Sequence, residues 1–162
     1  MAEMTPIKTK QSRLKLGSTP KTGVRTQFGA LCWRVRKGKL QVLLVKTRRR
    51  KRWIIPKGWP MHNATPMEAA ATEAFEEAGV QGKPSPITLG IYSYKKYKDP
   101  EDDPMQVVVA VFPLKVKTML DDYPEKGQRK RKWFTPEAAA ERVDSRELAQ
   151  MLRNFDPRPL KL

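Results

Sequence analysis

The first third of the chain alternates between apolar runs and short polar breaks. Residues 28–35 and 40–46 are rich in β-branched and aromatic residues, and the polar residues 36–39 separate them. Two apolar runs joined by such a short polar break are typical of a β-hairpin. Residues 53–56 form a third short extended piece that ends at a proline. The pattern therefore predicts three strands in this part of the chain.

The clearest helix of the sequence begins at Thr65. Threonine is a favourable N-cap, Pro66 fits the first helical turn, and Glu68 completes a capping box. Small and apolar residues then recur at helical spacing as far as Ala78, and Gly79 provides a stop. The pattern predicts an amphipathic helix that ends at Ala78.

The second half of the chain contains both extended and helical segments. Residues 87–94 and 105–116 are predicted strands on either side of a polar loop, and the second is so continuously apolar that it should be central and buried. A last short strand is expected at residues 132–134, before helices that start near Thr135 and Ser145. Strands mixed with helices, several of them joined by hairpins, predict an α+β fold with a mixed sheet between helices.

Length and charge restrict the organisation and the partners of the chain. A chain of 162 residues is most simply one domain. The chain has 33 Lys and Arg residues and 17 Asp and Glu residues, so its net charge is +16. This charge favours a polyanionic partner, either nucleic acid or a small polyphosphate. Residues 1–24 are polar and basic, and we expect a flexible tail there, before a single domain over residues 25–162.

The scarcity of cysteine and histidine excludes several kinds of site. Cys32 and His62 are the single residues of their types, so the chain forms no internal disulfide, histidine-based triad or zinc cluster. We expect Cys32 in the core and His62 at the surface or near a substrate. No segment approaches the roughly 18 continuous apolar residues of a membrane span, and the opening MAEMTPIKTKQSRLKLG lacks the apolar stretch of a secretion signal. We therefore expect a cytoplasmic protein with no membrane partner.

Three glutamates, Glu73, Glu76 and Glu77, share one face of the predicted helix. Like charges at this spacing destabilise a helix by about 0.2–0.5 kcal/mol for each pair, so something should offset their repulsion. A hard divalent cation such as Mg²⁺ does so, because it prefers carboxylate and carbonyl oxygens and bridges them to substrate phosphates. A solvated acidic face beside Lys or Arg is the alternative, and these residues alone leave both interpretations open.

The segment from Gly58 to Val80 resembles the signature of the Nudix hydrolases, G-x5-E-x7-R-E-U-x-E-E-x-G-U, where U is an aliphatic residue. It keeps the length of the signature and matches it at Gly58, Glu73, Glu76, Glu77, Gly79 and Val80, with Ala74 in an aliphatic position. Two positions differ, because Ala64 stands where the signature has glutamate and Thr72 where it has arginine. In the family these two residues form an ion pair that supports the loop and the helix.

The resemblance implies a single Nudix hydrolase domain, folded as an α/β/α sandwich, that uses Mg²⁺ or alternatively Mn²⁺. In the family the glutamates that match Glu73 and Glu77 bind the metal, and the one that matches Glu76 assists with metal or water. The carbonyl at the position of Lys57 often adds a ligand. The implied catalytic residues are thus Glu73, Glu76 and Glu77, and the implied metal ligands are the same three and Lys57, whereas we expect Glu68 to cap the helix.

Similarity beyond the signature covers roughly residues 27–155. The patterns GALCWR, LQVLLVKTRRRKRWIIPKGW, EAFEEAGVQG and GQRKRKWFTPEAA resemble the diphosphoinositol polyphosphate phosphohydrolases, and the Pro-Lys-Gly turn also occurs in diadenosine polyphosphate hydrolases. The resemblance implies metal-assisted attack of water on a diphosphate linkage of such a polyphosphorylated small molecule. Basic residues that could hold the phosphates are Arg25, Lys46, Arg48, Arg50, Arg52, Arg129 and Arg131.

Two other functions are compatible with the sequence. The substitutions at Ala64 and Thr72 and the net charge of +16 would also suit a nucleic-acid-binding or regulatory protein on a degenerate Nudix scaffold. Hydrolysis of capped or triphosphorylated RNA ends would share the chemistry of the first interpretation. The sequence carries no signal for the oligomeric state.

Aromatic residues beside the signature and near the polar loop of residues 95–104 could distinguish a nucleotide from another phosphate-rich ligand. A nucleotide base would stack on an exposed ring, and four residues are candidates for this role: Trp59, Tyr92, Tyr94 and Tyr97. Trp53, in contrast, is expected to lie in the core.

Overall fold

A computed structural model of the chain describes residues 11–14, 25–97, 99, 101 and 103–161. The tail that we predict over residues 1–24 lies outside the described residues except for 11–14. Leu14 hydrogen-bonds to Asn63 and Ala64, so these four residues are not the free tail that we predict, and the flexibility of residues 1–10 and 15–24 stays a prediction. No described helix is long and apolar enough to cross a membrane.

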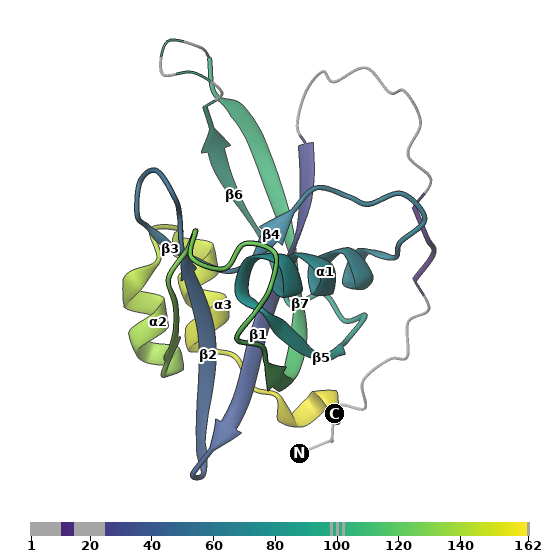
Figure 1. Ribbon diagram of the computed structural model, residues 1–162, viewed down its shortest axis with the longest axis vertical. Helices are drawn as coiled ribbons and strands as arrows, with labels where there is room; N and C mark the ends of the chain where they lie inside the picture. Colours follow the sequence, from purple (N-terminus) through teal and green to yellow (C-terminus); the bar gives the residue numbers. More distant parts are fainter. Residues whose placement is uncertain (1–10, 15–24, 98, 100, 102, 162) are drawn as a thin grey trace.

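A mixed sheet of eight strands forms the centre of the described part of the chain (Figure 1). The strands are β1 (Arg25–Arg36), β2 (Lys39–Lys46), β3 (Trp53–Ile54), β4 (Lys57–Gly58), β5 (Val80–Pro84), β6 (Gly90–Lys96), β7 (Met105–Met119) and β8 (Arg131–Phe134). Strands β1 and β7 pair in parallel, and the other described pairs are antiparallel. The main path runs in the order β3-β2-β1-β7-β5.

The parallel pair β1–β7 lies in the middle of this sheet. Strand β1 also pairs with β2 and β4, and β7 also pairs with β5 and β6. Val107, Val109 and Val111 of β7 are fully buried, which confirms the predicted central strand. An uninterrupted apolar run is what a strand covered on both faces requires.

Helices cover both faces of the sheet. Three α-helices lie within the described residues: α1 (Pro66–Ala78), α2 (Pro136–Arg142) and α3 (Arg146–Arg153). On one face, Ala74 of α1 packs in a core cluster with Phe28 of β1. On the other, Leu152 of α3 packs in a second cluster with Leu31 of the same strand. Successive side chains of β1 thus point to opposite helical layers, which confirms the predicted sandwich.

Helix α1 begins and ends where its sequence predicts. The hydroxyl of Thr65 accepts a hydrogen bond from the Glu68 N–H at 3.2 Å, and Gly79 closes the helix in the left-handed conformation with φ 66°. The face toward the sheet consists of alanines that are at most 1% exposed: Ala69, Ala70, Ala74 and Ala78. Because alanine is small, helix α1 lies close to the sheet, and its glutamates Glu73 and Glu77 come to lie against strand β4.

Strands β4 and β5 differ from the sequence-based expectation. Residues 80–84 form β5 along the edge of β7, and Lys57–Gly58, which reads as part of a turn, pairs with β1 as β4. The strand expected at 87–94 begins at Gly90 instead. These segments are too short or too rich in glycine and proline to show an alternating pattern, and the neighbouring strands supply their pairing partners.

Two side-chain placements from the sequence can be compared with the fold. Cys32 is fully buried in the α1 cluster, as expected, and burial raises the pKa of its thiol, with a smaller contribution from Glu77. Trp53 is only partly buried and packs edge-on against Phe134, with ring centroids 5.2 Å apart. Trp53 therefore lies at the margin of the core rather than inside it.

Replacing Gly79 with alanine should destabilise the protein more than replacing Gly38. Both residues have positive φ, so each substitution should cost about 1 kcal/mol in backbone strain. A Cβ on Gly38 would meet nothing within 4 Å, whereas one on Gly79 would lie 2.9 Å from the carbonyl oxygen of Leu120. We expect urea denaturation to show at least about 1 kcal/mol of additional loss for Gly79→Ala. Equal losses would contradict the packing around the end of α1.

Candidate active site

Strand β4 and helix α1 meet at a point where a side chain on residue 58 could not fit. A Cβ on Gly58 would overlap the carboxylate of Glu73. Because glycine has no Cβ, this carboxylate lies directly against the backbone of β4. The glycine that opens the signature therefore has a steric role, and it places Glu73 beside Lys57 and Gly58.

Glu77 lies on the same side of β4 and is only 5% exposed. Its Oε2 accepts a hydrogen bond from the backbone N–H of Lys57 at 3.3 Å. Its Oε1 is 3.8 Å from the guanidinium of Arg129, whose side chain is 13% exposed. Two carboxylates of α1 thus flank the two-residue strand β4.

The electrostatic surroundings disfavour the charged forms of both carboxyl groups. Burial raises the pKa of Glu73 to about 7, and the negative charges of Glu77, Glu76 and Glu125 add to the shift. Burial also raises the pKa of Glu77, although Arg129 and Lys57 oppose it. The positive charges at this site are too few to keep both carboxyl groups fully ionised at neutral pH, and a bound divalent cation would provide the remainder.

The side chain of Lys57 compensates for the two carboxylates only in part. Burial lowers its pKa in spite of the attraction of Glu77, and its ammonium group lies 4.5 Å from the ring centroid of Tyr94. Lys57 therefore stabilises the ionised form of Glu77 both through its charge and through its backbone N–H.

The oxygen donors at β4 fit a hard divalent cation. Within the described residues, no three His, Cys, Asp or Glu side chains converge into a preformed metal cluster. Glu73 and Glu77 do flank β4, and the carbonyl of Lys57 belongs to the same short strand. Carboxylate and carbonyl oxygens are the ligands that Mg²⁺ and Mn²⁺ prefer. The geometry thus favours Glu73, Glu77 and the Lys57 carbonyl as metal ligands. The role of Glu76 as a metal ligand and catalytic residue stays a prediction.

A fourth carboxylate, which sequence analysis does not single out, lies at the same place. The backbone N–H of Glu125 donates to the carbonyl of Glu76 at 3.0 Å, and the Glu125 carboxylate is 3.4 Å from Arg129 Nε. Its negative charge raises the pKa of both Glu73 and Glu77. The sequence gives no sign of this role, because Glu125 simply follows two other acidic residues, Asp121 and Asp122, and a contact between such distant positions has no local pattern.

Two of the arginines expected to bind substrate, Arg129 and Arg131, contact helix α1. Arg129 lies between the carboxylates of Glu77 and Glu125. Arg131 donates to the carbonyl of Ala78 at 2.7 Å and therefore satisfies the C-terminal end of α1. Their roles toward a substrate stay predictions, but the structure assigns each of them a contact that supports the site.

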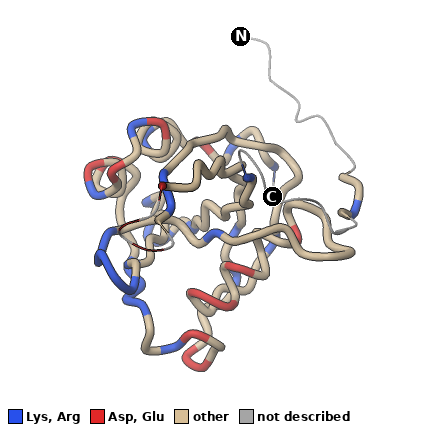
Figure 2. The backbone as a smooth tube through the Cα atoms, turned by 90° about the horizontal axis from the view of Figure 1, so that it is seen from above, with Lys and Arg blue, Asp and Glu red and all other residues tan. Residues whose placement is uncertain are grey.

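The remaining basic residues lie on strands and loops, and Figure 2 shows where Lys and Arg occur along the whole described backbone. Arg52 pairs with Asp144 at 2.8 Å, and Arg48 donates to Gln128 at 2.8 Å. Lys46 lies over the ring of Trp53, 5.4 Å from its centroid. Contacts with other side chains of the protein thus restrain Arg52, Arg48 and Lys46.

Arg25 and Arg50 lie over aromatic rings. Arg25 is 5.8 Å from the ring centroid of Trp59, and Lys96, which sequence analysis does not select, is 5.3 Å from the same ring. Arg50 is 5.3 Å from the ring of Tyr97. A Lys or Arg side chain that lies over an aromatic ring is kept ordered by that contact, and its charge remains available to a phosphate.

The candidate stacking residues are not equally accessible. Tyr92 is 4% exposed, and its hydroxyl has no hydrogen-bond partner among the described residues, so it is a core residue and cannot stack on a base. Tyr94 is half-buried and donates from its hydroxyl to Gln27 at 2.6 Å. His62 is exposed, as expected.

Comparison with known proteins identifies the class of this chain. The model of the NUDIX domain matches residues 25–155, so the chain belongs to the Nudix family. Its fold resembles that of an Ap4A hydrolase from C. elegans, with a TM-score of 0.55 and 23% identity over 80% of this chain and 94% of that one. It also resembles that of a NUDIX hydrolase from Nitrosomonas europaea, with a TM-score of 0.61 and 17% identity over 80% of this chain and 86% of that one.

Individual relatives are Nudix hydrolases of two kinds. Nudix hydrolase 12, mitochondrial, from Arabidopsis thaliana is 35% identical over 119 residues, which cover 72% of this chain and 59% of the relative. Human diphosphoinositol polyphosphate phosphohydrolase 3-alpha is 32% identical over 119 residues, which cover 72% and 68%. The chain spans 53% to 59% of the length of three Arabidopsis relatives, all named as mitochondrial, and its expected cytoplasmic location stays a prediction.

The stability of the metal-free protein should fall as the pH rises through neutrality. The folded-state pKa of Glu73 is about 7, above the ordinary glutamate value of 4.5, so its stabilising contribution is complete below about pH 4.5 and is lost as the pH rises through 7. We expect Mg²⁺ to raise the melting temperature much more at pH 8 than at pH 5, because binding requires ionised carboxylates. In Glu73→Gln this difference between the two pH values should shrink. A Mg²⁺ effect of the same size at pH 5 and pH 8 would contradict the assignment.

Proposed function

We propose that this protein hydrolyses a diphosphate linkage in a phosphate-dense small molecule, with Mg²⁺ or Mn²⁺ bound at Glu73, Glu77 and the Lys57 carbonyl. The observation that carries the proposal is the pair of carboxylates held against β4, where a side chain on Gly58 would displace one of them. Membership of the Nudix family and the net charge of +16 support it.

In the proposed reaction the glutamates have different roles, either as metal ligands or as the proton acceptor. When bound, the cation neutralises charge on the phosphate oxygens and makes a water molecule more acidic. In this proposal Glu73 and Glu77 would hold the ion, and Glu76, which is less buried than Glu77, would accept the proton of the attacking water. The water oxygen forms a bond to phosphorus, the bond from phosphorus to the bridging oxygen breaks, and the departing phosphate keeps that electron pair.

The candidate stacking residues favour a substrate without a base. The rings of Trp59, Tyr94 and Tyr97 each have a Lys or Arg side chain over them. A ring in that position serves to hold a cation, so the surface offers ordered positive charges rather than bare faces for stacking. Such a surface suits a diphosphoinositol polyphosphate better than a dinucleoside polyphosphate, in line with the name of the human relative.

A substrate panel should separate these two classes. We expect kcat/KM for a diphosphoinositol polyphosphate to exceed that for diadenosine tetraphosphate at least about tenfold, since several phosphates can engage ordered cations at once. Phosphate release should require added Mg²⁺ or Mn²⁺. The opposite ranking would contradict the assignment of substrate class, and hydrolysis of neither compound would contradict the proposed function.

The variant Glu77→Gln should lose about two to three orders of magnitude in kcat. The amide oxygen can still accept the hydrogen bond from Lys57, so the fold should be retained while a ligand charge is lost. Glu68→Gln is the matched control, because Glu68 lies in the first turn of the same helix, where its backbone N–H bonds to the Thr65 cap. Undiminished turnover in Glu77→Gln would contradict the metal-assisted mechanism.

Nucleic-acid binding is the second candidate, because Tyr97 is 39% exposed and has Arg50 of a basic loop over its ring. A single strand would contact such a combination of cation and ring. If this were the function, RNA binding would weaken steeply with salt and with Tyr97→Ala, and no metal-dependent hydrolysis would accompany it.

A further inference from the structure

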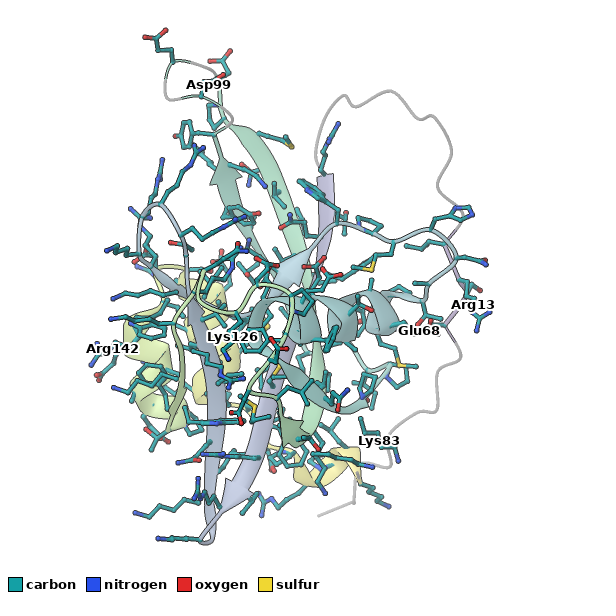
Figure 3. The ribbon with its side chains drawn as sticks, viewed as in Figure 1. Arg13, Glu68, Lys83, Asp99, Lys126 and Arg142 are labelled. Carbon is teal, nitrogen blue, oxygen red and sulfur yellow. The ribbon has the colours of Figure 1, made fainter. Side chains whose placement is uncertain are left out.

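Residues 11–14 lie against the loop that leads from β4 into α1, and we name them the N-terminal clasp. The N–H of Leu14 donates to the carbonyl of Ala64 at 2.9 Å, and the carbonyl of Leu14 accepts from the N–H of Asn63 at 2.7 Å. The Leu14 side chain packs against the core cluster that contains the alanines of α1. Figure 1 shows the segment beside this loop, and Figure 3 labels Arg13 of the clasp and Glu68 in the first turn of α1.

Gln11 connects the clasp to the helix itself. Its side-chain Oε1 accepts from the N–H of Met67 at 2.9 Å, and its Nε2 donates to the carbonyl of Pro86 at 3.0 Å. The first N–H groups of a helix have no partner within the helix, and Thr65 satisfies only that of Glu68. Gln11 is therefore a second cap of α1 that comes from a distant part of the chain.

The clasp contacts the loop where this sequence departs from the Nudix signature. Ala64 carries no charge, and the Thr72 hydroxyl donates to the carbonyl of Glu68 within its own helix at 2.9 Å. Asn63 adopts a left-handed conformation with φ 66°, which asparagine tolerates better than most residues other than glycine. The two hydrogen bonds of Leu14 hold Asn63 and Ala64 in place.

We infer that the N-terminal clasp positions the metal site, in place of the ion pair that Ala64 and Thr72 cannot form. The loop joins β4, which contacts the carboxylates, to α1, which carries them. Fixing the loop and the first turn of α1 therefore fixes Glu73 relative to Gly58. Gln11 and Leu14 are positioning residues, and the inference rests on the proposed function only in that the site binds a divalent cation.

Three variants of the full chain test this inference. Leu14→Pro removes the donor to Ala64, Gln11→Ala removes the bonds to Met67 and Pro86, and Ser12→Ala changes an exposed side chain of the same segment as a control. Titration with Mn²⁺, followed by electron paramagnetic resonance, should show roughly tenfold weaker binding in the first two variants, the size typical of residues that orient metal ligands. Ser12→Ala should bind Mn²⁺ as the unchanged protein does.

Amide hydrogen exchange reports on the contact independently of any activity. The amide of Asn63 should be protected in the unchanged protein and should exchange faster in Leu14→Pro, while the amide of Val109 in the buried strand β7 should not change. With an active substrate, kcat should fall in Gln11→Ala and KM should stay the same, because the phosphate-binding cations are not altered.

The outcomes separate this inference from the proposed function. Unaltered Mn²⁺ affinity in both Gln11→Ala and Leu14→Pro would overturn the inference, as would an unprotected Asn63 amide in the unchanged protein. If Leu14→Pro fails to fold, Gln11→Ala decides on Mn²⁺ affinity alone. If Mn²⁺ affinity and exchange respond as expected but no polyphosphate is hydrolysed, the inference stands and the proposed function fails.

Discussion

The site depends on one close approach, that of the Glu73 carboxylate to the backbone of β4 at Gly58. This approach requires glycine at position 58 and a helix that lies close to the sheet, which the alanine face of α1 allows. It also leaves two carboxyl groups half-buried or buried with raised pKa values. An arrangement that keeps repelling carboxylates in place is the expected form of a cation site, because the ion supplies the attraction that the protein lacks.

The excess positive charge of the chain has several separate uses. Arg129 contacts two carboxylates of the site, and Arg131 satisfies the end of α1. Arg25 and Lys96 lie over Trp59, where their charges remain near the surface. A net charge of +16 therefore indicates an anionic partner but does not identify the residues that bind it, since the environment of each side chain decides its role.

Local patterns were sufficient to predict much of this fold. The limits of α1 depend on Thr65 and Gly79, and the burial of β7 depends on its own apolar run, so both could be predicted. Strand β4 has two residues and no periodicity, and the contact of Glu125 with Glu76 joins distant parts of the chain. Features that arise only from tertiary pairing, including the hydrogen bonds of Leu14, have no signature in the sequence around them.

The central claim is that the carboxylates beside β4 bind a divalent cation, and its most direct test is the anomalous scattering of Mn²⁺ in crystals of this protein. The account predicts one strong anomalous peak within coordination distance of the Glu73 and Glu77 carboxylates and the Lys57 carbonyl, and its loss in crystals of Glu77→Gln. Mn²⁺ bound only elsewhere, or a peak at β4 that persists unchanged in Glu77→Gln, would contradict the account.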